Sequence, residues 1–256
     1  MQLEKYIKTE LAKPEKDILL MTHIVLGYPS LEVNREVIKQ MVAGGVELIE
    51  MQIPFSEPMA DGPTIVQANQ EALDTGITVE ECMAFGQEMC ATHDIAFLFM
   101  TYYNIVYKYG QEAFCQKSKE YGIKGFIIPD LPPEEGDTFL KMAQQYDISP
   151  ILIYAPTSTN ERMQTLAGHA DGFMYCVARK GVTGQKTDLN TEFDEYIGRC
   201  RAATSLPLAV GFGISSKEDI TTLTGKAAIG VIGTATINLV NSEGAEAVGP
   251  FIKGLR

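Results

Sequence analysis

The sequence predicts an α/β protein that folds as a single (β/α)8 barrel over residues 1–256. Three observations favour this fold: eight short apolar runs recur along the chain, an amphipathic stretch follows each of them, and no linker or shift in composition divides the chain. Near-continuous hydrophobicity is typical of parallel strands that are covered on both faces. Eight such βα units in about 250 residues match the size of one (β/α)8 barrel.

The expected strands are the apolar runs at 19–26, 46–53, 95–102, 125–128, 150–154, 172–177, 206–212 and 227–232. An N-terminal helix precedes them, and an apolar stripe over 33–42 predicts a helix that the glycines at 44 and 45 close. Other helices are expected near 78–91, 111–121, 134–143, 160–168, 191–202 and 216–224, with one more opening after Gly233. The second and third strands lie nearly two units apart, and Pro63 suits the start of an extra helix there.

A doubly wound open sheet is the alternative architecture. Its dinucleotide-binding fingerprint would read G-x-G-x-x-G, whereas residues 211–216 read G-F-G-I-S-S. The missing third glycine favours the barrel.

The formal net charge of −12 argues against binding to nucleic acid or to an anionic membrane, because both need a basic face. An anionic small-molecule substrate stays possible, since backbone N–H groups can hold a phosphate. No apolar run is long enough for a signal peptide or a membrane span. Five cysteines without a C-x-x-C pair, and only three histidines, favour reduced thiols and no metal site. We therefore expect a soluble, cytoplasmic protein.

The carboxyl ends of the strands should form the active site. Glu50 stands in the otherwise apolar second strand, where lost solvation penalises a charged carboxylate and suits general acid–base chemistry. A structural carboxylate is the alternative. Period-two alternation places Gln52 on the same face. Asp61 follows in a proline-bracketed loop, either as a second carboxylate across the mouth or as the N-cap of the next helix.

Small residues follow strands six, seven and eight, in the segments R-K-G-V-T-G (179–184), G-F-G-I-S-S (211–216) and G-T-A-T (233–236). Glycine lets the backbone approach a ligand, and the starts of helices offer N–H groups to an anion. These loops predict a phosphate site, with plain tight turns as the alternative. Lys180 is expected to be a solvated lysine rather than a Schiff-base former.

Three side chains near the strand ends remain ambiguous. Tyr102 ends the third strand and is expected to wall the pocket, while Tyr175 faces either the pocket or the core. His23 in the first strand is expected to be a core or pocket-edge imidazole rather than a catalyst.

These segments together resemble the tryptophan synthase alpha chain family over essentially the whole sequence. The residues that carry the resemblance are Glu50, I-P-F-S-E-P-M-A-D-G-P-T (53–64), M-T-Y-Y-N (100–104), P-D-L-P (129–132) and the three glycine-containing loops. The resemblance implies a lyase that splits indole-3-glycerol phosphate into indole and glyceraldehyde 3-phosphate. It also implies no cofactor in this chain and a beta-chain partner that carries pyridoxal phosphate, in an expected alpha2beta2 heterotetramer.

The resemblance also assigns roles to single residues. Glu50 would protonate the indole ring carbon and deprotonate the glycerol hydroxyl, and Asp61 would hold the indole N–H. The substrate-binding residues it implies are Tyr102, Ile153, Tyr175, Thr183, Gly184, Phe212, Gly213, Gly233 and Thr234. Gly184, Gly213, Gly233 and Thr234 would hold the phosphate, whereas Tyr102 and Ile153 would line the indole pocket.

The chain departs from the family pattern close to these residues. Gln52 replaces a usual glycine, His23 a usual hydrophobic residue and Glu57 a usual aspartate, and Tyr28 stands where a polar residue is common. An active lyase in an alpha–beta complex is therefore expected. The alternative is a weakly catalytic or non-catalytic subunit that binds and activates a beta chain.

Overall fold

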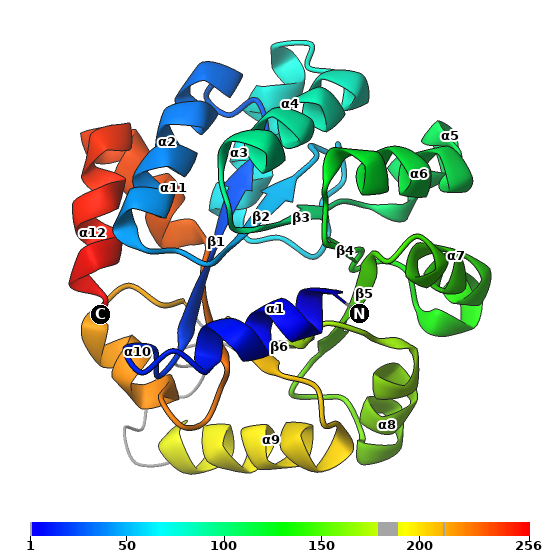
Figure 1. Ribbon diagram of the computed structural model, residues 1–256, viewed down its shortest axis with the longest axis vertical. Helices are drawn as coiled ribbons and strands as arrows, with labels where there is room; N and C mark the ends of the chain where they lie inside the picture. Colours follow the sequence, from blue (N-terminus) through cyan, green and yellow to red (C-terminus); the bar gives the residue numbers. More distant parts are fainter. Residues whose placement is uncertain (1, 179–188, 212) are drawn as a thin grey trace.

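The computed structural model describes residues 2–178, 189–211 and 213–256, and its eight strands close a parallel barrel in the order β1 to β8 (Figure 1). The strands are β1 (Leu19–Val25), β2 (Leu48–Gln52), β3 (Ala96–Met100), β4 (Gly125–Ile127), β5 (Ser149–Tyr154), β6 (Met174–Val177), β7 (Leu208–Gly211) and β8 (Ile229–Ile232). The predicted (β/α)8 barrel is therefore confirmed, with each strand lying inside or within one residue of its expected run.

Helices surround the barrel in a ring (Figure 1). They are α1 (Gln2–Leu11), α2 (Leu31–Gly44), α3 (Pro63–Asp74), α4 (Val79–Thr92), α5 (Tyr103–Tyr109), α6 (Gln111–Tyr121), α7 (Pro133–Gln145), α8 (Asn160–His169), α9 (Leu189–Ala203), α10 (Lys217–Leu223), α11 (Thr234–Glu243), the 3-10 turn η1 (Ala245–Ala247) and α12 (Val248–Gly254). The extra helix α3 starts at Pro63 as predicted, and Gly45 closes α2 at a φ of 96°. The short elements α5, η1 and α12 were not expected from the sequence.

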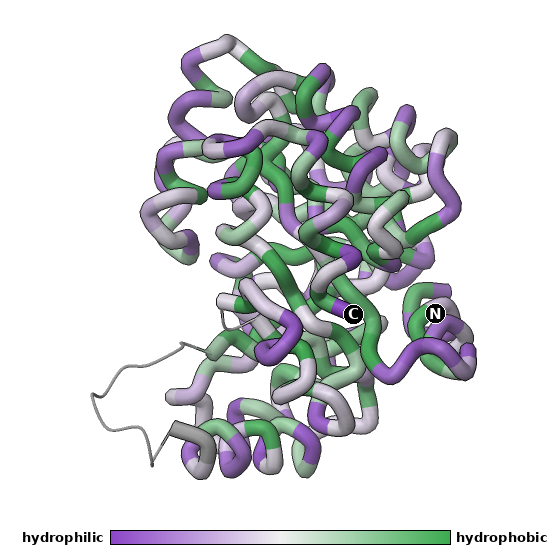
Figure 2. Tube along the Cα trace, turned by 90° about the vertical axis from the view of Figure 1, so that its left-hand side faces the viewer, coloured by the Kyte–Doolittle hydropathy of each residue, from purple (hydrophilic) through white to green (hydrophobic). Residues whose placement is uncertain are grey.

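Side chains alternate between the inside of the barrel and the helix layer. Leu19, Met21, Leu48 and Leu98 belong to the cluster that fills the barrel, whereas the intervening residues of the same strands pack against the helices. In Figure 2, which colours the chain by hydropathy, hydrophobic segments run through the middle of the molecule. Strands buried on both faces explain why the sequence shows continuous apolar runs rather than alternation.

Helix α1 covers the end of the barrel at which the strands begin (Figure 1). Leu3 and Ile7 are fully buried in the barrel-filling cluster, and the Tyr6 hydroxyl donates to the carbonyl of Glu47 at 3.0 Å. Closing this end leaves the other end, where the strands finish, to open toward ligands. Across the described ranges, no helix is long and apolar enough to cross a membrane.

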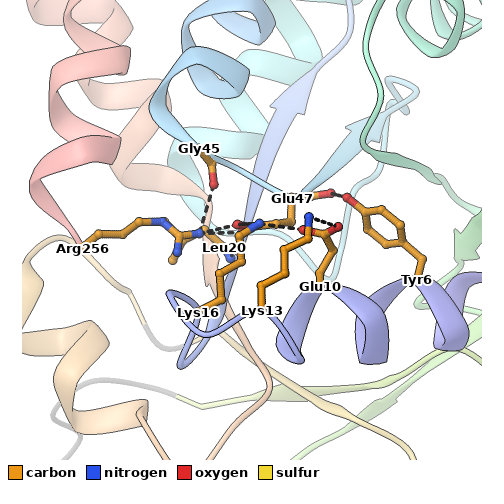
Figure 3. A network of polar contacts seen from close by, with 8 residues as sticks. All are labelled: Tyr6, Glu10, Lys13, Lys16, Leu20, Gly45, Glu47 and Arg256. Atoms are coloured by element: carbon orange, nitrogen blue, oxygen red, sulfur yellow. Dashed lines mark hydrogen bonds and ion pairs between the residues drawn. The ribbon is translucent and has the colours of Figure 1, made fainter.

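Glu47 ties both ends of the chain to the barrel, as Figure 3 shows. Its carboxylate is 3% exposed and accepts from Arg256 Nη2 at 2.7 Å, from the Leu20 backbone N–H at 2.8 Å, and forms an ion pair with Lys16 Nζ at 2.9 Å. Lys16 also pairs with Glu10 at 2.6 Å. A buried carboxylate with this many charged donors is satisfied, and its removal would leave cations without their shared acceptor.

We predict that Glu47→Gln lowers the free energy of unfolding by about 2 kcal/mol, less than the roughly 3–5 kcal/mol typical of a fully buried pair, because Lys16 and Arg256 keep other acceptors and some water. Urea unfolding followed by circular dichroism measures this loss. Glu36→Gln is the control, since Glu36 pairs with Lys39 on an exposed face and the substitution should leave the unfolding midpoint nearly unchanged. Equal effects of the two substitutions would contradict the anchoring role of Glu47.

Candidate active site

Strand β2 delivers two polar side chains to the inside of the barrel near its open end. Leu48, Glu50 and Gln52 share the inward face, and Glu50 is 4% exposed while Gln52 is fully buried. The parallel register sets His23 of β1 beside Glu50 and Val25 beside Gln52. The expectation that Gln52 borders the pocket of Glu50 agrees with this arrangement.

His23 lies directly against Glu50. The imidazole Nδ1 is 3.4 Å from Glu50 Oε1, and both side chains are almost completely buried. Burial disfavours the imidazolium, but the carboxylates of Glu50 and Asp61 outweigh that effect and raise the pKa of His23. The sequence placed His23 at the pocket edge or in the core, and did not indicate that it pairs with Glu50.

Asp61 is held by two side-chain donors. Its Oδ2 accepts from Gln52 Nε2 at 2.8 Å and from the Tyr102 hydroxyl at 3.0 Å. The Tyr102 oxygen in turn accepts from the Ala60 backbone N–H at 3.1 Å. Burial raises the pKa of Asp61, and its bonds to Gln52 and Tyr102 do not fully offset that shift. The alternative role of Asp61 as a helix cap is wrong, because Gly62 is the N-cap of α3 and makes no side-chain capping bond.

Asn69 fixes the loop that carries Asp61. Its Oδ1 accepts from the Phe55 backbone N–H at 3.0 Å and from Gln52 Nε2 at 3.4 Å, while its Nδ2 donates to the Ile65 carbonyl at 2.8 Å. Asn69 thus connects the end of β2 to helix α3. Sequence reasoning missed it, and the only available signal was a polar residue on the apolar stripe of the helix beginning at Pro63.

Aromatic and aliphatic side chains wall the cluster. The rings of Phe55 and Tyr102 stack with centroids 5.0 Å apart. Ile153 and Tyr175 are register neighbours on β5 and β6 and pack into the barrel-filling cluster. Burial, followed by the charges of Glu50 and Asp61, raises the pKa of Tyr175, so its phenol is neutral. The sequence left open whether Tyr175 faces the pocket or the core. Its nearness to Glu50 and Asp61 favours the pocket.

Three buried polar atoms of this cluster lack a hydrogen-bond partner among the described residues. They are His23 Nε2, Glu50 Oε2 and Gln52 Oε1. A buried polar atom without a partner costs about 1–3 kcal/mol, so a cluster of three indicates a place where a polar ligand binds. Among the described residues, no group of three or more His, Cys, Asp or Glu side chains is placed to hold a metal ion.

Two of the three segments predicted to bind phosphate have described residues at this end of the barrel, after β7 and after β8. Gly233 is the N-cap of α11 without a side-chain capping bond, and Thr234 is exposed in the first turn, so this helix start can receive an anion. Gly213 is exposed at a φ of 82° with open space around it. The start of α10 differs, because the Asp219 carboxylate accepts from the backbone N–H groups of Ser215 and Ser216. Thr183, Gly184, Lys180 and Phe212 lie outside the described residues.

A (β/α)8 barrel that gathers two carboxylates, an imidazole and an open helix start at the carboxyl ends of its strands is a barrel enzyme for acid–base chemistry on a small anionic substrate. Comparison with known proteins narrows this class. The family described as tryptophan synthase alpha chain matches residues 9–249. The chain belongs to the tryptophan synthase alpha chain family, and is a lyase of tryptophan biosynthesis that catalyses the indole-3-glycerol phosphate half-reaction.

Proteins similar to this chain match it over nearly its whole length. The tryptophan synthase alpha chain of Desulfotalea psychrophila is 62% identical over 256 residues, which covers 100% of both chains. The solved tryptophan synthase subunit alpha of Legionella pneumophila is 29% identical with a TM-score of 0.89, covering 99% of this chain and 96% of that one. A chain of the solved tryptophan synthase complex from Pyrococcus furiosus is 25% identical with a TM-score of 0.85, covering 93% of this chain and 97% of that one.

We predict that Asp61→Asn stabilises the protein at pH 7 but not near pH 4. A carboxyl whose pKa is raised by folding binds its proton more tightly in the folded state, so the resulting stability is complete in acid and is lost as the pH rises through the raised pKa. The asparagine side chain does not ionise, so the Asp61→Asn variant keeps this stability as the pH rises. Urea midpoints at the two pH values measure it, with Asp74→Asn on the exposed end of α3 as control. A difference from wild type that does not change with pH would contradict the prediction.

We predict that Gln52→Leu lowers the free energy of unfolding by about 1 kcal/mol, because Asp61 loses a buried donor. The decrease in the free energy of unfolding stays small, because the substitution also removes Gln52 Oε1, a buried oxygen without a hydrogen-bond partner among the described residues. Gln67→Leu provides the control, since the Gln67 side chain donates to Glu71 on the exposed face of α3. An unchanged unfolding midpoint for Gln52→Leu would show that the amide does not support Asp61.

Proposed function

We propose that Glu50 and Asp61 are the residues with which this chain cleaves indole-3-glycerol phosphate to indole and glyceraldehyde 3-phosphate. The observation that carries this assignment is the buried carboxylate of Glu50, whose Oε2 has no partner among the described residues while Asp61 is held nearby by two donors. A carboxyl group shielded from water, with one free oxygen, suits proton transfer to and from a bound substrate.

The cleavage is a retro-aldol reaction with a closed proton balance. Glu50 donates a proton to the ring carbon of indole that bears the side chain, and it accepts the proton of the adjacent glycerol hydroxyl. The carbon–carbon bond breaks as that hydroxyl becomes the aldehyde, and the bonding electrons return to the indole ring. Asp61 accepts a hydrogen bond from the indole N–H, where positive charge develops while the ring carbon is protonated.

The remaining residues bind the two ends of the substrate. Gly213, Gly233 and Thr234 hold the phosphate through the backbone N–H groups of their loops and of the α11 start, which lacks a side-chain cap. The family resemblance adds Gly184 to this set, and gives Thr183 the task of orienting Asp61 as its loop closes.

The indole ring lies among apolar and aromatic groups. Ile153, Tyr102 and Tyr175 supply the described part of this wall, and the resemblance adds Phe212. A ring stacked among such side chains is removed from water, which strengthens its hydrogen bond to Asp61.

The partner is a beta chain. The family is that of a subunit of tryptophan synthase, and the Pyrococcus furiosus relative was solved as a tryptophan synthase complex. We propose an alpha2beta2 assembly in which the beta chain carries pyridoxal phosphate and receives indole from this chain. None of the steps assigned to this chain needs a cofactor.

We predict that Glu50→Gln lowers the rate of indole release by about 10²–10⁴-fold, because the amide can neither give nor take the proton. Indole is measured after mixing the purified chain with indole-3-glycerol phosphate, with and without a beta chain. Glu71→Gln, an exposed change on α3, should leave the rate unchanged.

The outcomes separate the competing functions. Wild-type cleavage that rises on adding the beta chain fits an alpha subunit. Cleavage that survives intact in Glu50→Gln would overturn the role of this carboxylate. No indole from the wild-type chain in either assay, despite tight binding to the beta chain, would leave the activating subunit as the function.

A further inference from the structure

We propose that His23 and Glu50 act as a pair that stores the single mobile proton of the cleavage, with His23 as the positioning and proton-sharing residue behind Glu50. The inference rests on the proposed function of Glu50. It concerns a side chain to which the family pattern gives no proton, since a hydrophobic residue is usual at position 23.

The geometry assigns different tasks to the two oxygens of Glu50. Oε1 faces His23 Nδ1 at 3.4 Å, while Oε2 has no partner among the described residues. An imidazole N–H on Oε1 orients the carboxyl group and leaves Oε2 as the oxygen that meets the substrate. The side chains of His23 and Glu50 are 6% and 5% exposed, so water hardly competes for the contact.

Charge balance explains why the pair holds one proton. Glu50 and Asp61 bring two carboxylates into a buried space, which is costly unless a cation accompanies them. His23, on the neighbouring strand β1, supplies the imidazole that contacts Glu50. The carboxylates of Glu50 and Asp61 raise the pKa of His23. One proton shared by His23 and Glu50 gives a neutral pair, with Asp61 left to receive the charge that develops on the indole.

The shared proton completes the reaction cycle without net exchange with solvent. Glu50 Oε2 gives its proton to the indole ring carbon, and the pair is then an anion with a neutral imidazole. The same oxygen next accepts the proton of the glycerol hydroxyl as the carbon–carbon bond breaks. The pair thereby regains the proton it began with, ready for the next substrate.

The groups around His23 set its titration. Strand β2 and the loop after it contribute Glu50, Asp61 and the uncharged amide of Gln52. The phenol of Tyr175 on β6 lies near the same two carboxylates. Between strand β8 and helix α11 lies Gly233, where an added Cβ would come within 3.8 Å of the His23 Cβ. From α11, the Thr236 hydroxyl donates to the His23 carbonyl at 3.5 Å, and both groups are uncharged. The two carboxylates raise the pKa of His23, so its imidazole keeps a proton above the pH at which a free histidine loses it.

The test compares pH profiles of indole release for wild type, His23→Phe and His23→Asn. Phenylalanine keeps the ring volume without a proton, and asparagine keeps an N–H near the position of Nδ1 but cannot ionise. We expect kcat to fall about 10–100-fold in both variants, KM to change less than about threefold, and the alkaline limb to move toward acid by about one pH unit or more.

Asparagine separates positioning from proton storage. Recovery of both the rate and the wild-type alkaline limb in His23→Asn would overturn the proton-sharing role. A wild-type profile in His23→Phe would overturn the whole inference. If His23→Phe keeps the wild-type profile while Glu50→Gln abolishes cleavage, the proposed function stands and only the inference fails. If Glu50→Gln retains full activity, the proposed function itself fails.

A direct titration keeps the inference testable even if a variant folds poorly. The chain has three histidines, so imidazole NMR signals of the wild-type protein can be followed individually. We expect the His23 midpoint above 6.5, and a lower midpoint in Glu50→Gln, while His93 and His169 stay unchanged between the two proteins. A His23 midpoint below 6.5 in wild type would overturn the proposal.

Discussion

The register of β2 in the closed barrel is the constraint on which the site depends. Alternation along this strand sends Leu48, Glu50 and Gln52 inward, and its pairing with β1 sets His23 beside Glu50. A shift of one residue would turn all three toward the helix layer and bury the acid–base group against aliphatic side chains. Barrel closure prevents this shift, because β2 is hydrogen-bonded on both sides, to β1 and to β3. Backbone pairing therefore fixes Glu50, whereas Asp61, in the loop after β2, depends on its bonds to Gln52 and Tyr102.

The two ends of the barrel divide stability from activity. At the closed end, Glu47 joins the residues before β1 and the last residue, Arg256, to the start of β2. Every charge there has its partners. Three residues further along the same strand, Glu50 keeps an oxygen without a partner among the described residues. The well-satisfied end compensates for the cost of the other, as expected where catalytic groups are held in arrangements that do not favour stability.

The sequence predicts most of the fold because its signals are local. Continuous apolar runs indicate the eight strands, Pro63 and Gly45 mark helix boundaries, and the motif around Asp61 points to the family. The pairing of His23 with Glu50 could not be predicted, since it depends on a register between strands 27 residues apart and not on any pattern within either. The role of Asn69 could not be predicted for a related reason. On an amphipathic helix, the function of a buried polar residue is recognised only once its hydrogen-bond partners are located in the structure.

The departures from the family pattern are consistent with one another. A glutamine in place of glycine on an inward strand position adds bulk, yet the amide is fully buried and bonds to Asp61. A histidine in place of a hydrophobic residue adds a polar ring, yet it meets Glu50. Each change adds a polar group to one carboxylate: Gln52 donates to Asp61, and the His23 imidazole contacts Glu50. In the proposed cleavage, the polar atoms that stay unpartnered among the described residues would face the substrate, so satisfying them on binding would contribute to affinity.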